Sequence, residues 1–441
     1  MTGRRLHFVG IGGAGMSGLA LVAHVLGAQV TGSDRGDSPY LERVRAAGIT
    51  PALGHDAANL PAGDDVEVVL STAIPPDNPE LAAARERGLR ERHRGELLAE
   101  LAARKRCIAV AGTHGKTTTA SMAAHALLRC DMDPAYLIGG ELRSTGVNAA
   151  WGTGEWIVVE ADESDRSFLA LAPELAVVTN VELDHHATYG SQAEVEDAFL
   201  AFLRGAHRPI LWDAPDADAL LDRGDIGEAA FFRAEDVELS RGGSTFTWAR
   251  QRVALSVPGA HNVANAAAAL TACALAGAPA DRLAGALEDF RGAARRFERL
   301  GRTASGAEVV DDYAHHPTEV AATLAAARTL QPARLVAVFQ PHLYSRTERL
   351  YREFGNALCA ADVVAVLDIY PARERAEDHP GVTGRLVAAA AADAAPGRQV
   401  LWLPDHDTAR RVLEPRLREA DLCLVMGAGD VDALGRALVA G

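Results

Sequence analysis

Lysine is almost absent from this 441-residue sequence. Lys105 and Lys116 are the only two lysines among 44 basic residues, and every other basic residue is arginine. The lysine ammonium is a compact point charge, whereas the arginine guanidinium is a broad plane, so the two side chains are not interchangeable. A lysine that stands against this bias indicates a position that needs a compact cation, and Lys116 lies in a glycine-containing segment.

Long apolar runs, basic clusters and cysteines with metal-binding spacing are also lacking. Residues 263–280 come nearest to an apolar run, but Asn265, Thr271 and Pro279 interrupt them, which predicts a buried helix and not a membrane span. The five scattered cysteines are typical of reduced core residues in a cytoplasmic protein. A net charge of -15 without a basic run argues against nucleic-acid binding. We therefore expect a cytoplasmic globular protein with neither a nucleic-acid nor a membrane partner, either a monomer or a homodimer.

Short apolar strands alternate with helical stretches along the chain. Strands are predicted at residues 6–9, 29–32, 66–70, 107–111, 156–159, 175–179, 309–311, 335–339, 363–367 and 422–426. This alternation is typical of α/β folds with mostly parallel sheets. The predicted fold has three such domains, a Rossmann-like one at 1–104, a P-loop ATPase-like one at 105–294 and a Rossmann-like one at 295–441.

A phosphate-binding loop is predicted at Gly112-Thr113-His114-Gly115-Lys116-Thr117, between a buried strand and a helix. In such loops the backbone N–H groups and the helix N-terminus bind phosphates, the lysine reaches the β- and γ-phosphates, and the hydroxyl binds Mg²⁺. The strict pattern has glycine where this chain has Val110. The neighbouring strand and helix still favour nucleotide binding over a structural turn.

Acidic residues and histidines follow the next two strands. Glu160 ends one strand and is followed by Asp162, Glu163 and Asp165, a grouping that favours a metal site over a solvated acidic loop. The segment 180–186 follows strand 175–179 and contains His185. A loop histidine alone is more often a surface residue. His185 becomes a metal or phosphate ligand only if its strand lies beside the phosphate-loop strand.

The first glycine-rich turn has the spacing of a dinucleotide fingerprint. Gly10, Gly12 and Gly15 follow a strand and open a helix, and Asp34 ends the next strand. A nicotinamide-dependent dehydrogenase is one alternative that this turn supports, but it leaves the Lys116 loop and the acidic strand end unexplained. A P-loop switch or binding module is another alternative.

The remaining polar motifs have both a structural and a functional interpretation. Asn262 and Asn265 precede or begin an alanine-rich helix, where asparagines often serve only as caps. Arg295 and Arg296 form either a domain-junction clamp or a solvated charge pair. The stretches 311–317, 342–346 and 427–430 each follow a strand, and the first two are rich in side chains that bind anions or transfer protons.

Taken in order, these motifs resemble those of the Mur ligases of peptidoglycan synthesis. The resemblance runs from about residue 6 to residue 432 and rests on segments 10–18, 112–119, 160–165, 179–180, 261–262, 295–297, 311–319 and 339–342. Within the family, the chain is most similar to members that join L-alanine to UDP-N-acetylmuramate. A ligase that adds a tripeptide to the same nucleotide sugar shares the phosphate loop and stays as an alternative.

The resemblance implies a role for each matching residue. The first domain would bind the UDP-sugar through Gly12, Gly13, Ala14, Gly15, Asp34, His55, Ser71, Ala73 and Arg94. ATP would contact Gly112, Thr113, His114, Gly115, Lys116, Thr117, Thr118, Asn262, Asn265 and Arg296, and Mg²⁺ would contact Thr117, Glu160 and His185. Catalysis would involve Lys116, His185, His315, His342 and Arg346. The reaction implied is transfer of phosphate from ATP to the sugar carboxylate, followed by attack of the amine of L-alanine on the acyl phosphate.

Two departures from the family pattern carry expectations of their own. His186-Ala187 stands where the family usually has Met-Asp, so a role for that aspartate is lost or moved. Related Mur ligases use a carbamylated lysine near the metal, and this chain has no lysine after Lys116. The proton acceptor for the attacking amine is His315 or His342, and the sequence does not choose between them.

Overall fold

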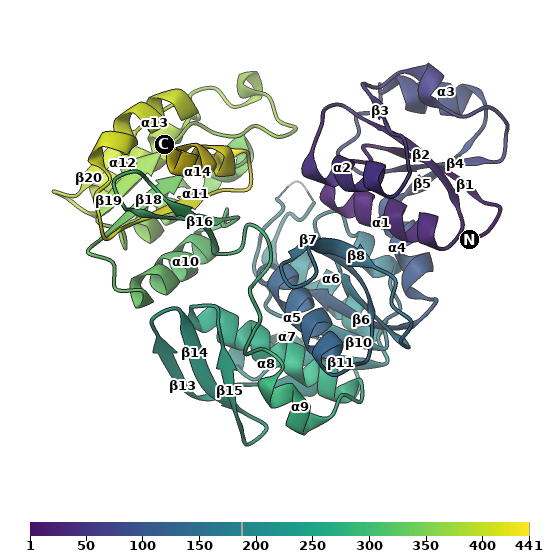
Figure 1. Cartoon of the computed structure of the whole chain (residues 1–441), viewed down its shortest axis with the longest axis horizontal. Coiled ribbons are helices and arrows are strands. Elements are labelled where there is room, and N and C mark those ends of the chain that lie inside the picture. Colours follow the sequence, from purple (N-terminus) through teal and green to yellow (C-terminus); the bar gives the residue numbers. More distant parts are fainter. Residues whose placement is uncertain (187, 441) are drawn as a thin grey trace. The chain divides into compact units, whose positions relative to one another are not determined.

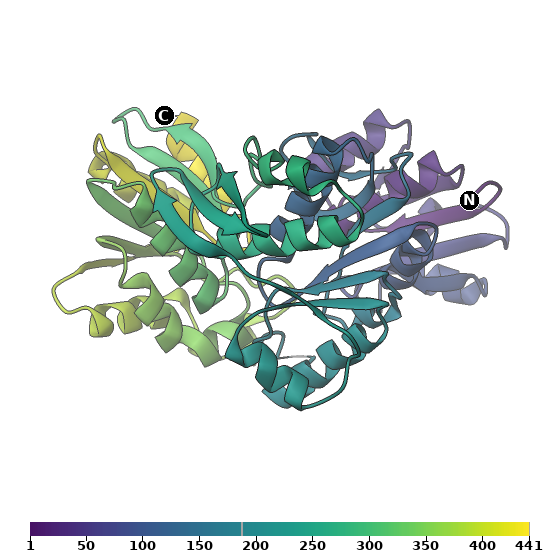
Figure 2. The same ribbon diagram turned by 90° about the horizontal axis from the view of Figure 1, so that it is seen from below.

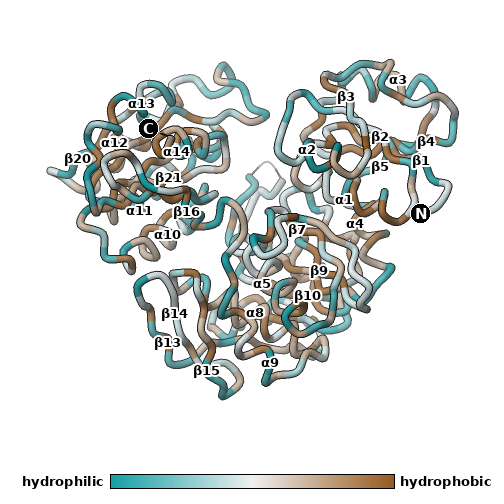
Figure 3. Tube along the Cα trace, viewed as in Figure 1, coloured by the Kyte–Doolittle hydropathy of each residue, from teal (hydrophilic) through white to brown (hydrophobic). Residues whose placement is uncertain are grey.

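The computed structural model describes residues 1–186 and 188–440. It is an α/β structure with four sheets, three of them mostly parallel. By the packing of its Cα atoms the chain forms two compact units, Met1–Arg233 with Asn265–Ala286, and Ala234–Ala264 with Leu287–Gly441. Figure 3 shows hydrophobic residues gathered along the strands, with hydrophilic loops around them.

The first sheet has the order β3-β2-β1-β4-β5, and all its pairs are parallel. Its strands are β1 Arg5–Val9, β2 Gln29–Asp34, β3 Ala52–Leu53, β4 Val66–Leu70 and β5 Arg90–His93, and its helices are α1 Ala14–Val25, α2 Pro39–Ala46, α3 Pro79–Glu86 and α4 Arg94–Ala102. Successive strand residues face opposite sides, so Phe8 packs in the cluster that contains Leu19 of α1, whereas Val9 packs with Leu81 of α3. Helices therefore cover both faces of the sheet (Figures 1 and 2).

The second sheet, in the same unit, has the order β12-β11-β10-β6-β9-β7-β8. Its strands are β6 Arg106–Ala111, β7 Ala135–Leu142, β8 Val147–Ala150, β9 Trp156–Glu160, β10 Leu175–Val178, β11 Arg208–Trp212 and β12 Ala230–Phe232. The helices of this part are α5 Lys116–Arg129, α6 Gln192–Arg204, α7 Pro215–Asp222, α8 Ala260–Leu275 and α9 Ala280–Gly285. Strand β6 pairs in parallel with β10 on one side and β9 on the other, so the carboxyl ends of these three strands meet at one edge.

The other unit holds two sheets. An antiparallel sheet contains β13 Glu235–Ser240, β14 Gly243–Trp248 and β15 Gln251–Leu255. The larger sheet, ordered β16-β17-β21-β18-β19-β20, contains β16 Glu298–Arg302, β17 Glu308–Asp312, β18 Arg334–Phe339, β19 Val363–Val366, β20 Gln399–Trp402 and β21 Asp421–Met426. Its helices are α10 Pro317–Thr329, α11 Tyr344–Leu358, α12 Gly384–Ala394, α13 His406–Leu413 and α14 Val431–Ala440. Along β18, Ala337 packs in the cluster of Val320 in α10, and Val338 in that of Leu434 in α14.

Every strand predicted from the sequence is present, with ends that differ by at most two residues. A ligand role for His185 required its strand to lie beside the phosphate-loop strand. This condition is met, because β10 pairs directly with β6. The predicted buried helix at 263–280 is α8, which begins and ends earlier. The antiparallel β13–β15 sheet and the β7–β8 pair were not predicted. Among the residues that the structure describes, no helix is long and apolar enough to cross a membrane.

Candidate active site

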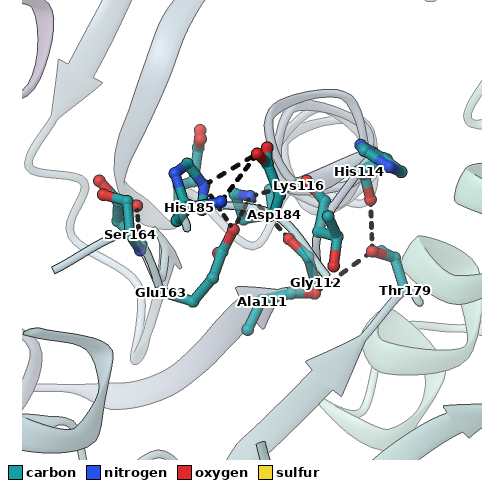
Figure 4. A network of polar contacts seen from close by, with 12 residues as sticks. Ala111, Gly112, His114, Lys116, Glu163, Ser164, Thr179, Asp184 and His185 are labelled. Atoms are coloured by element: carbon teal, nitrogen blue, oxygen red, sulfur yellow. Dashed lines mark hydrogen bonds and ion pairs between the residues drawn. The ribbon is translucent and has the colours of Figure 1, made fainter. Parts of the chain in front are cut away.

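The phosphate loop connects β6 to α5, and the end of β10 holds it in place. The backbone N–H of His114 donates to Asn180 Oδ1 at 2.9 Å. The Thr179 hydroxyl donates to the His114 carbonyl at 2.5 Å (Figure 4). Gly112 has a φ of +137°, and a Cβ there would lie 2.0 Å from Thr179 Oγ1. Because any side chain would be both strained and blocked, only glycine fits this position.

Lys116 is the first residue of α5, and its ammonium bridges the loop to the acidic strand end. Nζ donates to the carbonyl oxygens of Gly112 at 2.6 Å and Thr113 at 3.1 Å, and to Glu163 Oε1 at 2.8 Å. Burial alone would lower the pKa of Lys116, but the carboxylates of Glu163 and Asp162 outweigh it and raise that pKa above its usual value. The lysine is therefore a fixed cation at the loop.

Carboxylates from β9 and the loop after it line the same edge of the sheet. Glu160 Oε1 accepts from the Thr117 hydroxyl at 2.9 Å, and Oε2 accepts from the Gly139 N–H at 2.7 Å. Glu163 Oε2 is buried and has no hydrogen-bond partner among the residues that the structure describes. A hydroxyl with two carboxylates, one of which keeps a lone pair unused, is the oxygen donor set that Mg²⁺ prefers, so these residues fit the predicted cation.

The predicted ligand His185 lies at this edge as well. Its Nε2 lies 3.3 Å from Glu163 Oε1, and Figure 4 shows Lys116, Glu163 and His185 pointing toward one another. His185 has a φ of +53°, in the left-handed region that is uncommon for a residue other than glycine. Its backbone N–H donates to the Asp184 carboxylate at 2.7 Å, which fixes this turn. Of the two residues that depart from the family pattern, Ala187 lies outside the described residues.

Arg94 at the start of α4 links the first sheet's domain to the acidic loop of the second. Its guanidinium lies 2.6 Å from Asp162 Oδ2 and 3.2 Å from Asp165 Oδ2. Burial would raise the pKa of Asp162, but Arg94 and Lys116 outweigh it and hold the pKa of that carboxyl well below its usual range. Asp162 is thus an anion between two cations, one from each domain.

A cavity of about 220 Å³ lies where these domains meet. Its lining combines the start of α1, the start of α4, strand β7 and the acidic strand end: Ala14, Gly15, Gly18, Leu19, Arg94, Leu98, Leu137, Ile138, Gly139, Glu160 and Asp162. Residues that the sequence assigned to a sugar site, namely Ala14, Gly15 and Arg94, and the predicted metal ligand Glu160 therefore line one cavity. A molecule bound there would contact the glycine-rich turn and the acidic end of β9 together.

The glycine-rich turn itself is held by Asp34. The Gly12 N–H donates to Asp34 Oδ2 at 2.8 Å, and a Cβ at Gly12 would lie 2.9 Å from the same oxygen. Gly13 and Gly15 are exposed at the start of α1. In this arrangement the Asp34 carboxylate accepts from the turn, whereas a dinucleotide fingerprint would use it to bind a ribose hydroxyl.

His55, also assigned to the sugar site, lies against a buried carboxylate that sequence reasoning missed. Its Nδ1 lies 3.0 Å from Ser33 Oγ and 3.2 Å from Glu80 Oε1. Glu80 is fully buried and also pairs with His7 Nε2 at 2.8 Å. Burial opposes ionisation of Glu80, but hydrogen bonds from His7, Asn59 and Ser33 outweigh it and lower the pKa of Glu80 to about 2.

The other two residues of the predicted sugar site follow β4. Ser71 is half-buried and Ala73 is exposed. The Ile74 N–H donates to the Ser71 carbonyl at 3.1 Å and closes a turn there. Glu80 lies in the first turn of α3, and no sequence signal showed that it would be buried.

The two asparagines of α8 have different surroundings. Asn262 Nδ2 donates to the Pro258 carbonyl at 2.7 Å. Asn265 lies against the phosphate loop, because a Cβ at Gly115 would lie 2.4 Å from Asn265 Oδ1. Of the two residues predicted to contact the adenine side, Asn265 is therefore placed beside the loop within its own unit, and Gly115 must be a glycine there.

The remaining predicted residues gather in one cluster at the carboxyl ends of β17 and β18. Arg346 Nη1 lies 3.3 Å from His342 Nδ1, and the ring centroids of His342 and His315 are 6.1 Å apart. Arg296 packs on the ring of Tyr313, at 5.1 Å from its centroid, and Tyr313 packs edge-on against His315. Arginine, histidine and tyrosine side chains are thus concentrated at one sheet edge of this unit.

Family models match nearly the whole chain. The Mur ligase family catalytic domain matches residues 5–106, the Mur ligase middle domain matches residues 110–273, and the Mur ligase glutamate ligase domain matches residues 295–429. The UDP-N-acetylmuramate–L-alanine ligase of Streptomyces coelicolor is 46% identical over 449 residues, covering 98% of this chain and 96% of that protein. The ligase of the same name from Rubrobacter xylanophilus is 44% identical and covers 99% of both chains.

Solved structures give the same result. A UDP-N-acetylmuramate-alanine ligase from Thermotoga maritima is 29% identical with a TM-score of 0.84, and the match covers 99% of this chain and 98% of that one. A murein peptide ligase from Psychrobacter arcticus is 26% identical with a TM-score of 0.75, over the same shares of the two chains. Family models, relatives and folds agree over the length of the molecule. The chain belongs to the Mur ligase family.

Proposed function

We propose that this chain joins L-alanine to the carboxylate of UDP-N-acetylmuramate with ATP as the energy source, as a step in making peptidoglycan precursors. The observation that carries the proposal is a cavity lined by the glycine-rich turn, Arg94 and Glu160, whose carboxylate accepts from Thr117 of the Lys116 loop. Because a fold hosts many functions, the site and not the fold supports this choice. Relatives named for this activity, 44% and 46% identical over nearly the whole chain, support the choice of L-alanine.

The chemistry requires activation of a poor electrophile. A carboxylate does not react with an amine, but after transfer of the γ-phosphoryl group of ATP the resulting acyl phosphate does, and phosphate then leaves. Lys116 offsets the charge of the phosphates, and the loop N–H groups orient them. Mg²⁺, when bound by Thr117, Glu160 and His185, would supply further charge neutralisation. Arg94 is placed to bind and orient an anionic part of the sugar nucleotide.

The assignment of the other residues follows the same proposal. We assign ATP to Gly112, Thr113, His114, Gly115, Lys116, Thr117, Thr118, Asn262, Asn265 and Arg296. We assign the nucleotide sugar to Gly12, Gly13, Ala14, Gly15, Asp34, His55, Ser71, Ala73 and Arg94. We place the domain boundaries at 104/105 and 294/295 and the protein in the cytoplasm. The scattered, unpaired cysteines support that location.

Phosphate release is the measurement that tests the proposal. The protein is incubated with ATP, Mg²⁺ and UDP-N-acetylmuramate, with and without L-alanine, and the Lys116→Arg variant is run in parallel. We expect release only with both substrates, and a loss of at least about a hundredfold in the variant, because a guanidinium cannot replace the compact ammonium. Phosphate release at the same rate without the nucleotide sugar would contradict the ligase assignment.

The second candidate function is that of a murein-peptide ligase. It is supported by the structural similarity to the Psychrobacter arcticus enzyme, with a TM-score of 0.75. The two activities differ in the amine that attacks, a single amino acid or a tripeptide. Supplying the tripeptide L-alanyl-γ-D-glutamyl-meso-diaminopimelate in place of L-alanine separates them. We expect turnover with L-alanine alone. Turnover with the tripeptide alone would transfer the assignment to the second candidate.

A further inference from the structure

His315 and His342 lie at the same sheet edge, and either could accept a proton from the attacking amine. Their rings are 6.1 Å apart and cross nearly at right angles. A neutral imidazole carries its proton on one nitrogen and a lone pair on the other, and only the nitrogen with the lone pair acts as a base. The hydrogen bonds of each ring therefore decide which histidine has a basic nitrogen directed away from its partners.

The lone pair of His342 faces a cation. Its Nδ1 lies 3.3 Å from Nη1 of Arg346, four residues further along the chain. A guanidinium has donors and no acceptor, so Nδ1 of His342 must be the accepting nitrogen and Nε2 carries the hydrogen. The lone pair that would serve as a base is thus already engaged by Arg346, and protonating it would place a second positive charge beside the guanidinium.

His315 has the opposite arrangement. Its Nδ1 lies 3.0 Å from the Tyr313 carbonyl oxygen and 3.1 Å from Glu319 Oε2, and both of these atoms can only accept. The hydrogen is therefore on Nδ1, and the lone pair is on Nε2. A carboxylate behind a histidine fixes its tautomer and stabilises the imidazolium that forms when Nε2 takes a proton. The side chain keeps 18% of its surface exposed, so solvent or a substrate reaches it.

Glu319 is itself held firmly in place. Its Oε2 accepts the backbone N–H of His315 at 3.0 Å and that of His316 at 3.3 Å, as part of the capping box that begins α10. Its other oxygen lies 3.8 Å from Nη1 of Arg296. The carboxylate is therefore ordered without any ligand, and it fixes the ring of His315 before a substrate arrives.

We propose that His315 is the general base for the amine and that Glu319 is the positioning residue behind it; this inference rests on the ligase function proposed above. The neutral amine nitrogen of L-alanine forms a bond to the acyl carbon, and one of its N–H bonds breaks as that proton moves to Nε2 of His315. The carbon–oxygen bond to phosphate then breaks, and its electron pair leaves with the phosphate. The imidazolium returns its proton to water. His342 orients Arg346 and takes no proton.

The test compares two nucleophiles on the same acyl phosphate. Hydroxylamine is largely unprotonated at neutral pH and attacks without a base, and the resulting hydroxamate is measured by its colour with ferric ion. The His315→Gln variant is assayed with ATP, Mg²⁺ and UDP-N-acetylmuramate, and with either L-alanine or hydroxylamine. We expect the L-alanine rate to fall by about 10²–10⁴-fold, the usual contribution of a general base, with hydroxamate formation within about threefold of the unmodified protein.

Two further variants sharpen the test. Glu319→Gln keeps an acceptor for the backbone N–H groups, so we expect it to slow the L-alanine reaction alone, by about tenfold. His342→Gln should slow both reactions by the same factor, because it removes the imidazole that Arg346 contacts, and that contact is the same with either nucleophile. Hydroxamate formation by His315→Gln also shows that this variant is folded and still forms the acyl phosphate.

The contrary outcomes are distinct. Equal losses with both nucleophiles in His315→Gln, or a selective loss of the L-alanine reaction in His342→Gln, would overturn the assignment of the base. If the unmodified protein forms neither the amide nor the hydroxamate, the ligase function itself fails, and that result would not depend on any variant.

Discussion

Glu80 and Glu163 are both buried glutamates of the same unit, but their surroundings differ. Glu80 is fully buried and accepts from His7, Ser33 and Asn59 at 2.8–2.9 Å, so both its oxygens are engaged. Glu163 uses Oε1 for Lys116, while Oε2 has no partner among the described residues. A buried carboxylate normally has all its hydrogen bonds made. The comparison indicates that Glu80 stabilises the fold, whereas Glu163 keeps its Oε2 atom available for a ligand.

The largest expected effect is on stability, at Glu80. Glu80→Ala leaves the buried donors of His7, Ser33 and Asn59 without an acceptor, and we expect it to lower the free energy of unfolding by about 3–5 kcal/mol. Urea denaturation followed by circular dichroism measures this loss. Glu163→Ala is the matched variant, and we expect it to cost about 1 kcal/mol or less, because Lys116 keeps its bonds to Gly112 and Thr113. Similar losses in both variants would break the comparison.

The next effect is the dependence of stability on pH. The pKa of Glu80 is lowered from 4.5 to about 2 in the folded protein. A lowered folded-state pKa stabilises above the unfolded pKa, and this contribution disappears as the pH falls from about 4.5 toward 2. Linkage gives about 3 kcal/mol for the full titration. Glu80→Gln should lose correspondingly less stability over this range, as measured by urea denaturation at each pH. Parallel curves would show that Glu80 is not the group responsible.

The smallest effect concerns binding, at Glu163. In the proposed site its carboxylate would compete with nucleotide phosphate for Lys116 and would repel that phosphate, so Glu163→Gln should tighten binding of ADP without divalent cations by about tenfold. Isothermal titration calorimetry gives the dissociation constant. With Mg²⁺ present the advantage should shrink or reverse, because the variant has lost a charged oxygen ligand. Weaker binding of ADP by Glu163→Gln in the absence of Mg²⁺ would contradict this role of the Glu163 carboxylate.

The same contrast shows which parts of the site the sequence could predict. Lys116, Thr117 and Glu160 lie directly at strand and helix ends, where residue type and position relative to the strand suffice, and the structure brings these three together. The position of His185 depends on the pairing of β10 with β6. The sequence analysis could state this pairing as a condition but could not predict it. Glu80 could not be found, because its burial depends on how α3 packs over β1 and β2.

Hydrogen-bond geometry accounts for the other residues that the sequence left open. Asp34 could be placed near the glycine-rich turn by its spacing, but only the structure shows that its carboxylate accepts from Gly12. His315 and His342 carry the same functional group, and their difference lies in the atoms around Nδ1. These differences in role depend on where individual side-chain atoms lie, and periodicity and motif spacing do not encode those positions.

The loop that holds Lys116 also bears on how a newly made chain gains activity. The loop takes its shape from Thr179 and Asn180 at the end of β10, and Asn265 packs against Gly115 much later in the sequence. During synthesis, the lysine therefore leaves the ribosome long before the residues that shape its surroundings. Contacts so distant in sequence form late in folding. A nascent chain that ends before Asn265 should thus lack the complete set of contacts that shapes the loop around Lys116.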